Sequence, residues 1–261
     1  MIRRRELLLG LGAFLLAAPA LAGKKATARG GTKKQAAGGD YWRLNTEEGP
    51  VYVWVPPGYH RPTAGMVIYV HGYWTDVDRA WKEHRLPEQF RESRQNALFV
   101  VPAAPKDKED GVKWKALGDL RGAIRRKGIR LPDGHIVAIG HSGAYRTVAQ
   151  WVDHALISQI TLLDGFYGQE DAFEEFIVTG KNAKRHRLVL VGVETAPRGE
   201  AFVRKHKGVR RIGLPEKYED FTRAQRGARL LHIRAKAGHS ELVTGGFILP
   251  LLLRLTPLRR L

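Results

Sequence analysis

Short apolar segments alternate with amphipathic ones along most of the chain. Apolar runs of strand length occupy residues 51–59, 66–72, 97–102, 135–140, 157–163, 188–193 and 230–233. Helical spacing or helix-forming composition fills the intervals at residues 78–93, 117–127, 171–177 and 218–226, and residues 243–253 form a last apolar helix. Strands that are apolar throughout are typical of parallel strands buried on both faces. The pattern predicts a single α/β domain with a mainly parallel β-sheet and helices on both faces.

The first 22 residues follow a different pattern. Arg3, Arg4 and Arg5 precede an apolar run over residues 7–21, which ends in the small-residue sequence Ala20-Leu21-Ala22. This order predicts a cleavable signal peptide at residues 1–22. The run is shorter than the roughly 20 apolar residues that a spanning helix needs, so no transmembrane anchor is expected after cleavage. We therefore expect a periplasmic or secreted protein, and the arginines also resemble a twin-arginine signal.

Residues 23–40 are rich in Gly, Ala and Lys and have no apolar period. Such a composition is typical of a flexible linker, here a basic one, so we place the folded domain at residues 41–261. The chain has no cysteine. A disulfide or a thiolate metal site is therefore excluded, and the core must stabilise the domain.

The chain is strongly basic, with 44 Lys and Arg against 26 Asp and Glu and a net charge of +18. The positive residues are spread over the whole length and form no long basic helix. Nucleic acid is therefore not an expected partner, because it would require a clustered basic face. A basic surface facing an anionic envelope polymer agrees better with this distribution.

The sequence Gly140-His141-Ser142-Gly143-Ala144 follows directly after the apolar run at residues 135–140. A serine on a tight turn between a strand and a helix holds its hydroxyl exposed, and the small flanking residues leave room for the turn. Ala144 replaces the second glycine of the usual G-x-S-x-G pattern. The context predicts Ser142 as a nucleophile and the Gly143 N–H as a donor to an oxyanion. A helix-capping serine is the alternative.

Together with two segments upstream of it, this motif resembles the α/β-hydrolase superfamily of esterases, lipases and peptidases. The upstream segments are VYVWVPPGY, which begins at residue 51, and VIYVHGYW, which begins at residue 67. The resemblance spans residues 51–261 and implies that the turn after His71-Gly72 carries the first oxyanion-hole loop. By that resemblance the backbone N–H of Tyr73 joins that of Gly143, whereas His71 is expected to be structural.

The superfamily's order of nucleophile, acid and histidine implies a catalytic base well after Ser142. His239 lies in the polar loop Ala237-Gly238-His239-Ser240-Glu241, after the last strand and before the last helix, which matches the superfamily's position. The other histidines after Ser142 lie in predicted helices, in strands or in charged segments, and they are His154, His186, His206 and His232. We therefore predict His239 as the base.

Two carboxylates that follow predicted strands are candidates for the triad acid, Asp164 and Glu194. Most superfamily members place the acid after the penultimate strand, which favours Glu194. In that segment, however, threonine stands at position 195 where aspartate is usual. Asp164 is followed by Gly165 and can turn its carboxylate toward a histidine with little strain. We favour Asp164 and keep Glu194 as the alternative, with Asp171 and Glu200 less favoured.

No cofactor is expected, because the sequence has no phosphate-binding loop, no dinucleotide-binding glycine motif and no H-E-x-x-H motif. No metal site is expected either. The sequence predicts a serine hydrolase that cleaves an ester or amide in a small molecule or a polymer, with carboxylesterase, lipase or peptidase activity. The alternative is a catalytically silent hydrolase-like fold that binds cell-wall polymer or an envelope partner.

Overall fold

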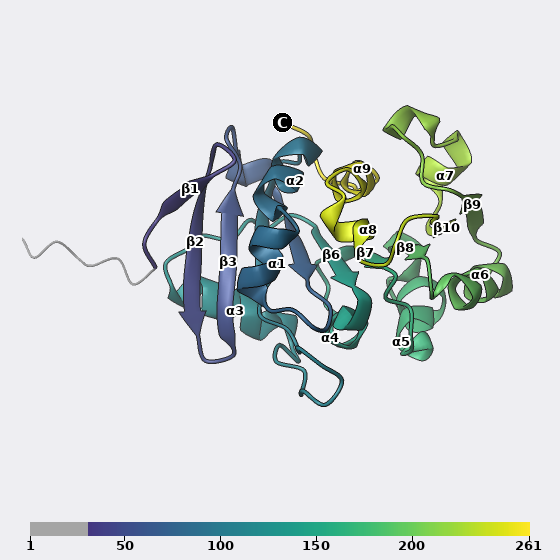
Figure 1. The fold of residues 1–261 in the computed structure, drawn as a ribbon, viewed down its shortest axis with the longest axis horizontal. Coiled ribbons are helices and arrows are strands. Elements are labelled where there is room, and N and C mark those ends of the chain that lie inside the picture. Colours follow the sequence, from purple (N-terminus) through teal and green to yellow (C-terminus); the bar gives the residue numbers. More distant parts are fainter. Residues whose placement is uncertain (1–30) are drawn as a thin grey trace, which may run out of the picture.

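A ten-stranded β-sheet forms the centre of the molecule (Figure 1) in a computed structural model that describes residues 31–261. The strand order is β1-β2-β3-β5-β4-β6-β7-β8-β10-β9. The strands are β1 (Lys34–Ala36), β2 (Gly39–Thr46), β3 (Gly49–Val55), β4 (Gly65–Val70), β5 (Ala97–Pro102), β6 (Ile136–His141), β7 (Ile157–Leu163), β8 (Arg187–Gly192), β9 (Val209–Ile212) and β10 (Leu230–Arg234). The sheet agrees with the predicted α/β class.

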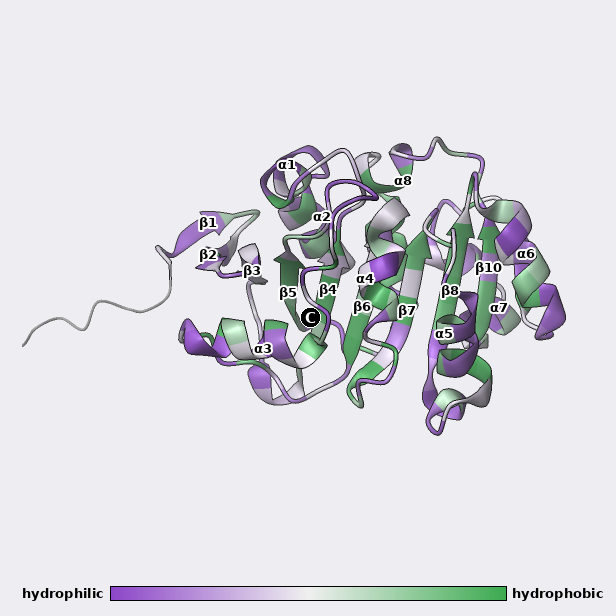
Figure 2. Ribbon diagram, turned by 90° about the horizontal axis from the view of Figure 1, so that it is seen from below, coloured by the Kyte–Doolittle hydropathy of each residue, from purple (hydrophilic) through white to green (hydrophobic). Residues whose placement is uncertain are grey.

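The sheet has an antiparallel end and a parallel remainder. β1, β2, β3 and β5 pair antiparallel in succession, whereas each pairing from β5 through β4 to β9 is parallel. The parallel strands β4, β5 and β6 are buried at every position, as their continuous apolar sequences predict. Figure 2 shows these strands as hydrophobic and β1, at the edge of the sheet, as hydrophilic.

The ordered sheet begins earlier in the sequence than expected. β1 and the first residues of β2 lie inside residues 23–40, which we predicted to be a linker. Backbone hydrogen bonds to β2 hold β1 in place. Because this edge strand is exposed, its sequence shows no alternation of apolar and polar residues. The predicted signal peptide at residues 1–22 lies outside the described residues.

Helices cover both faces of the sheet, with a hydrophobic core on each. On one face pack α3 (Leu117–Arg126), α4 (Tyr145–Ala149), α5 (Glu170–Glu174) and α6 (Ala196–Lys205). On the other face pack α1 (Val77–Glu83), α2 (Leu86–Ser93), α8 (Glu241–Thr244) and α9 (Ile248–Leu253), while α7 (Arg223–Gly227) lies beside β9. The prediction of helices on both faces is confirmed.

Several element boundaries differ from those predicted. The stretch at residues 78–93 is two helices, because Arg85 adopts a left-handed backbone (φ 49°) between them. The apolar segment at residues 243–253 is divided in the same way at Gly246 (φ 86°). Helix α6 and the edge strand β9 were not predicted, since their charged residues mask the apolar positions. Within residues 31–261, no helix combines the length and apolar character that a membrane span requires.

Parallel pairing brings the carboxyl ends of β4, β6, β7, β8 and β10 to one edge of the sheet. The loops that leave this edge carry the residues predicted to do chemistry. In open α/β sheets ligands bind at the same edge, outside the carboxyl ends of the strands.

Candidate active site

Ser142 lies on a strained turn between β6 and α4. His141 ends the strand in an extended conformation (φ −104°, ψ 134°), and Ser142 then adopts a left-handed backbone with φ 52°. A short 3-10 helix (Ser142–Ala144) leads into α4. A non-glycine residue with this φ is uncommon and costs of order 1–2 kcal/mol. The strand-turn-helix context predicted for Ser142 is therefore present.

Glycines make room around this turn. A Cβ atom on Gly72 would lie 2.7 Å from the Cβ atom of Ser142, and one on Gly165 would lie 2.9 Å from the Ser142 carbonyl oxygen. A side chain on Gly143 would collide with the ring of Tyr73. Ala144, by contrast, has a right-handed backbone with φ −61°, so the position does not require the usual glycine.

Asp164 and His239 meet at the same edge of the sheet. Asp164 follows β7 and is fully buried, and its Oδ2 lies 2.6 Å from Nδ1 of His239 in the loop after β10. A buried carboxylate accepts here, so the ring donates through Nδ1–H, which leaves Nε2 as the basic nitrogen of neutral His239. This is the tautomer that a serine nucleophile requires from its base.

Backbone and side-chain donors after β8 hold the Asp164 carboxylate. Oδ1 accepts hydrogen bonds from the Val193 N–H (2.9 Å), the Thr195 N–H (2.8 Å) and the Thr195 hydroxyl (2.8 Å). Oδ2 accepts a further bond from the Glu194 N–H at 3.2 Å. Thr195, which stands in place of an aspartate, thus holds the Asp164 carboxylate from the loop after the neighbouring strand β8. The sequence showed that threonine replaces the usual aspartate at position 195, but it did not show that this threonine binds Asp164.

The electrostatics of the pair follow from these contacts. Burial acts to raise the pKa of Asp164, but the hydrogen bonds from His239, Thr195 and Val193 outweigh it and bring the pKa well below its ordinary value. The hydrogen bond to Asp164, followed by the negative charge of Asp164, raises the pKa of His239 against the effect of burial. Asp164 is therefore ionised at neutral pH and favours a proton on His239.

Glu194 lies beside the pair but points to a different partner. Its Oε2 accepts a hydrogen bond of 2.8 Å from the hydroxyl of Tyr167, and its side chain is exposed. Within the described residues Glu194 makes no hydrogen bond to His239, because Nδ1 of His239 already bonds Asp164. Asp171 is exposed on α5, and Glu200 pairs with Arg204 and Arg210. Of the four candidate acids, all within the described residues, Asp164 is the one that forms a hydrogen bond with His239.

The side-chain ring of Tyr73 packs on the Cα atom of Gly143, where a Cβ atom would collide with the ring. The Tyr73 N–H makes no hydrogen bond to any described residue, and the Gly143 N–H lies in the first helical turn, where backbone donors lack partners. Arg146 steadies this arrangement. Its Nη1 donates to the Tyr73 hydroxyl (3.0 Å) and to the Lys108 carbonyl oxygen (2.8 Å). The sequence contained no signal for this role of Arg146.

The remaining histidines have structural surroundings. His71 is buried, its Nδ1 donates to the Gly72 carbonyl oxygen (2.8 Å), and its Nε2 accepts from the Ala104 N–H (3.1 Å). His232 is buried within β10, and His186 bonds the Phe176 carbonyl oxygen. His206 follows the last residue of α6, whereas His154 lies in the loop between α4 and β7 and not in the helix that was predicted to contain it. Within residues 31–261, His239 is the one of these histidines that forms a hydrogen bond with a candidate acid.

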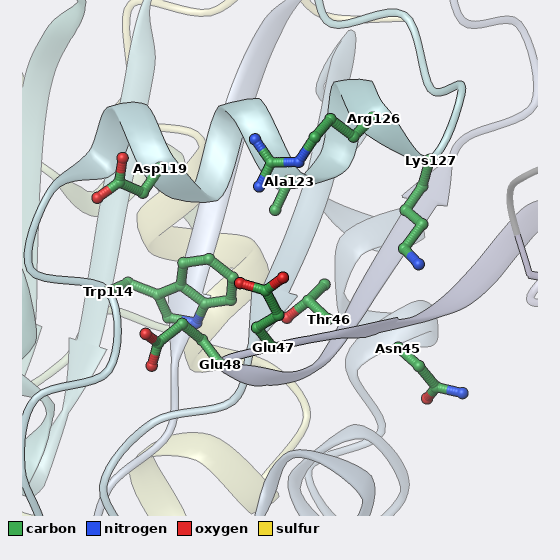
Figure 3. A pocket seen from close by; sticks show the side chains of 9 residues that line it. All are labelled: Asn45, Thr46, Glu47, Glu48, Trp114, Asp119, Ala123, Arg126 and Lys127. Atoms are coloured by element: carbon green, nitrogen blue, oxygen red, sulfur yellow. The ribbon is translucent and has the colours of Figure 1, made fainter.

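Two further features bear on what the site can bind. Asp164, Glu194 and His239 place potential ligand atoms within 4.8 Å of one another, the one such group of three among residues 31–261. The short Asp164–His239 hydrogen bond already uses two of those atoms. A cavity of about 800 Å³ lies elsewhere, between the β2–β3 turn and α3 (Figure 3). None of the predicted site residues lines that cavity.

The strand order and the carboxyl-edge loops define the α/β-hydrolase fold, and comparison with solved structures agrees. The feruloyl esterase module of Clostridium thermocellum is similar with a TM-score of 0.57 and 13% identity, over 87% of this chain and 88% of that one. The S-formylglutathione hydrolase of Agrobacterium tumefaciens is similar with a TM-score of 0.53 and 12% identity, over 85% and 96%.

A third similar structure is the fluorophosphonate-binding serine hydrolase F of Staphylococcus aureus, with a TM-score of 0.54 and 8% identity over 84% of this chain and 99% of that one. No family model and no curated protein matches the sequence. At these identities the structural likeness establishes the fold, and the site itself must carry the argument for function.

Proposed function

We propose that this protein is a serine hydrolase that cleaves an ester or amide bond through an acyl-enzyme. The observation that carries the proposal is the 2.6 Å Asp164–His239 hydrogen bond at the edge of the sheet where Ser142 stands on a strained turn. The esterases and serine hydrolases among the similar structures support it. Carboxylesterase activity on a small or polymeric ester is the form we propose.

In this mechanism the Ser142 oxygen attacks the substrate carbonyl carbon while His239 Nε2 takes the hydroxyl proton. The Asp164 carboxylate stabilises the imidazolium that forms. The N–H groups of Tyr73 and Gly143 donate to the oxyanion. His239 then protonates the leaving group as the carbonyl–oxygen or carbonyl–nitrogen bond breaks. Water, deprotonated by His239, then attacks the acyl carbon. The bond from that carbon to the Ser142 oxygen breaks, the acid leaves, and His239 returns the proton to Ser142.

A fluorophosphonate probe tests the proposal, because an activated serine reacts with it and an ordinary serine does not. We expect the protein to be labelled and to hydrolyse p-nitrophenyl acetate, and we expect Ser142→Ala to abolish both without lowering the melting temperature. Ser240→Ala is the matched control, because Ser240 is an exposed serine in the His239 loop and should retain full labelling. A folded protein that neither labels nor hydrolyses the ester would contradict the proposal and favour a binding role.

The predicted signal peptide and the basic composition of the chain add a location and a substrate preference to this proposal. A signal peptide at residues 1–22 would place the enzyme in the periplasm or outside the cell, where the excess of Lys and Arg over Asp and Glu favours anionic substrates or surfaces. Fractionation of cells that express the full chain, with N-terminal sequencing of the exported form, tests the location and the cleavage site.

A further inference from the structure

His141, the residue before the proposed nucleophile, makes an unusual contact for the last residue of a strand. Its side chain is 7% exposed, and its Nε2 lies 3.2 Å from the backbone carbonyl oxygen of His239. A carbonyl oxygen only accepts, so His141 must donate through Nε2–H. The bond joins two residues that are far apart in the sequence, the last residue of β6 and a residue in the loop after β10.

The two rings also touch. The ring centroids of His141 and His239 lie 4.7 Å apart with an interplanar angle of 41°. His239 belongs to a loop between β10 and α8, outside any strand or helix that would fix its backbone. Asp164 holds the ring of His239 at Nδ1, and His141 holds its backbone, so the imidazole is secured at two separate points.

The charge state of His141 suits this position. Burial, followed by the nearby charges of His239 and His84, lowers the pKa of His141 to about 3, although the bond to His239 and the charge of Asp164 oppose this effect. His84 lies behind it with a ring separation of 6.2 Å and is itself held by the Tyr69 hydroxyl. His141 is thus neutral when His239 becomes protonated during a reaction, and it places no like charge beside the imidazolium.

We infer that His141 is a positioning residue, which holds the His239 backbone through an Nε2–H hydrogen bond and so keeps the proposed base aligned with Ser142. The inference rests on the proposed function. A residue in this role acts on the proton-transfer step and leaves substrate binding unchanged, so its loss should lower kcat and leave KM nearly constant.

Amide substitutions of two lengths test the role of the hydrogen bond. In His141→Gln the amide nitrogen reaches about as far as Nε2 of histidine, whereas in His141→Asn it stops near the position of Nδ1. We expect His141→Asn to lower kcat for p-nitrophenyl acetate by about 10–100-fold, the effect of a misplacement of about 1 Å, and His141→Gln to restore kcat to within about fivefold of wild type. KM should change less than about twofold in both.

His141→Leu removes the donor altogether and should match His141→Asn, provided that its melting curve shows a folded protein. His232→Gln is the matched control, since it changes a buried histidine on β10 that does not contact the site and should keep wild-type kcat. Equal kcat values for His141→Gln and His141→Asn, both folded, would overturn the inference. Failure of the proposed function would look different, because wild-type protein would then not be labelled by the fluorophosphonate.

Discussion

The turns at Ser142 and Asp164 have similar backbone conformations, but the two side chains differ in their hydrogen bonding. Both residues follow buried strands, both have a positive φ (52° and 42°), and a glycine follows each of them. The Asp164 carboxylate, however, takes part in five hydrogen bonds, whereas the Ser142 hydroxyl has none to a described residue. The same strained turn thus fixes one side chain completely and leaves the other available to a substrate.

This difference shows that one side chain of the site is held rigidly while another is kept free to react. The strain at Asp164 is offset by charge-assisted hydrogen bonds, each worth more than a neutral one. The strain at Ser142 has no such compensation in its side chain, which is characteristic of strain retained for function. Three predictions would break or sharpen the comparison.

The largest effect should come from the carboxylates. Asp164→Asn leaves the turn in place but cannot favour the Nδ1–H tautomer of His239, so we expect kcat to fall by about 10⁴-fold. Glu194→Gln should reduce kcat by less than about fivefold, because Glu194 bonds Tyr167 and not His239. Steady-state ester hydrolysis with both purified variants is the measurement. A larger loss for Glu194→Gln than for Asp164→Asn would transfer the role of acid to Glu194.

The pH dependence of activity should report the same pair. The base must be neutral to accept a proton, so kcat/KM falls as pH falls through the pKa of His239. The hydrogen bond to Asp164 raises that pKa, which places the fall at higher pH than for an ordinary histidine. Asp164→Asn should move the titration of the His239 ring to lower pH, as followed by NMR. An unchanged titration would show that Asp164 does not stabilise the imidazolium.

The smallest effect concerns stability. Ser142→Gly removes the side chain from a left-handed position and relieves the strain, whereas Ser142→Ala keeps the Cβ atom that causes it. We expect the glycine variant to be more stable than the alanine variant by about 1 kcal/mol in the free energy of unfolding, although we expect neither to be active. Urea denaturation of the pair measures the difference. A more stable alanine variant would mean that the turn is not strained.

Local sequence predicted most of the sheet and the position of Ser142. The apolar runs at residues 97–102 and 157–163 coincide with β5 and β7, because a strand buried on both faces carries its own signal. Helix α6 and strand β9 lie at the outer edge of the sheet, where partial exposure weakens that signal. Hydrogen bonding across β1, β2 and β3 likewise ordered residues that composition alone assigned to a linker.

The sequence alone determined the fold class, the turn at Ser142 and a short list of partners for it, since each depends on residues that are close together in the chain. The structure decided which carboxylate meets His239. It also revealed the tasks of Thr195, Arg146 and His141. These contacts join residues that are 31 to 98 positions apart in the sequence, and the pairing of β4, β6, β7, β8 and β10 brings them together. A residue's own neighbours in the sequence carry no trace of such a partner, so chemistry that depends on it appears only in the folded chain.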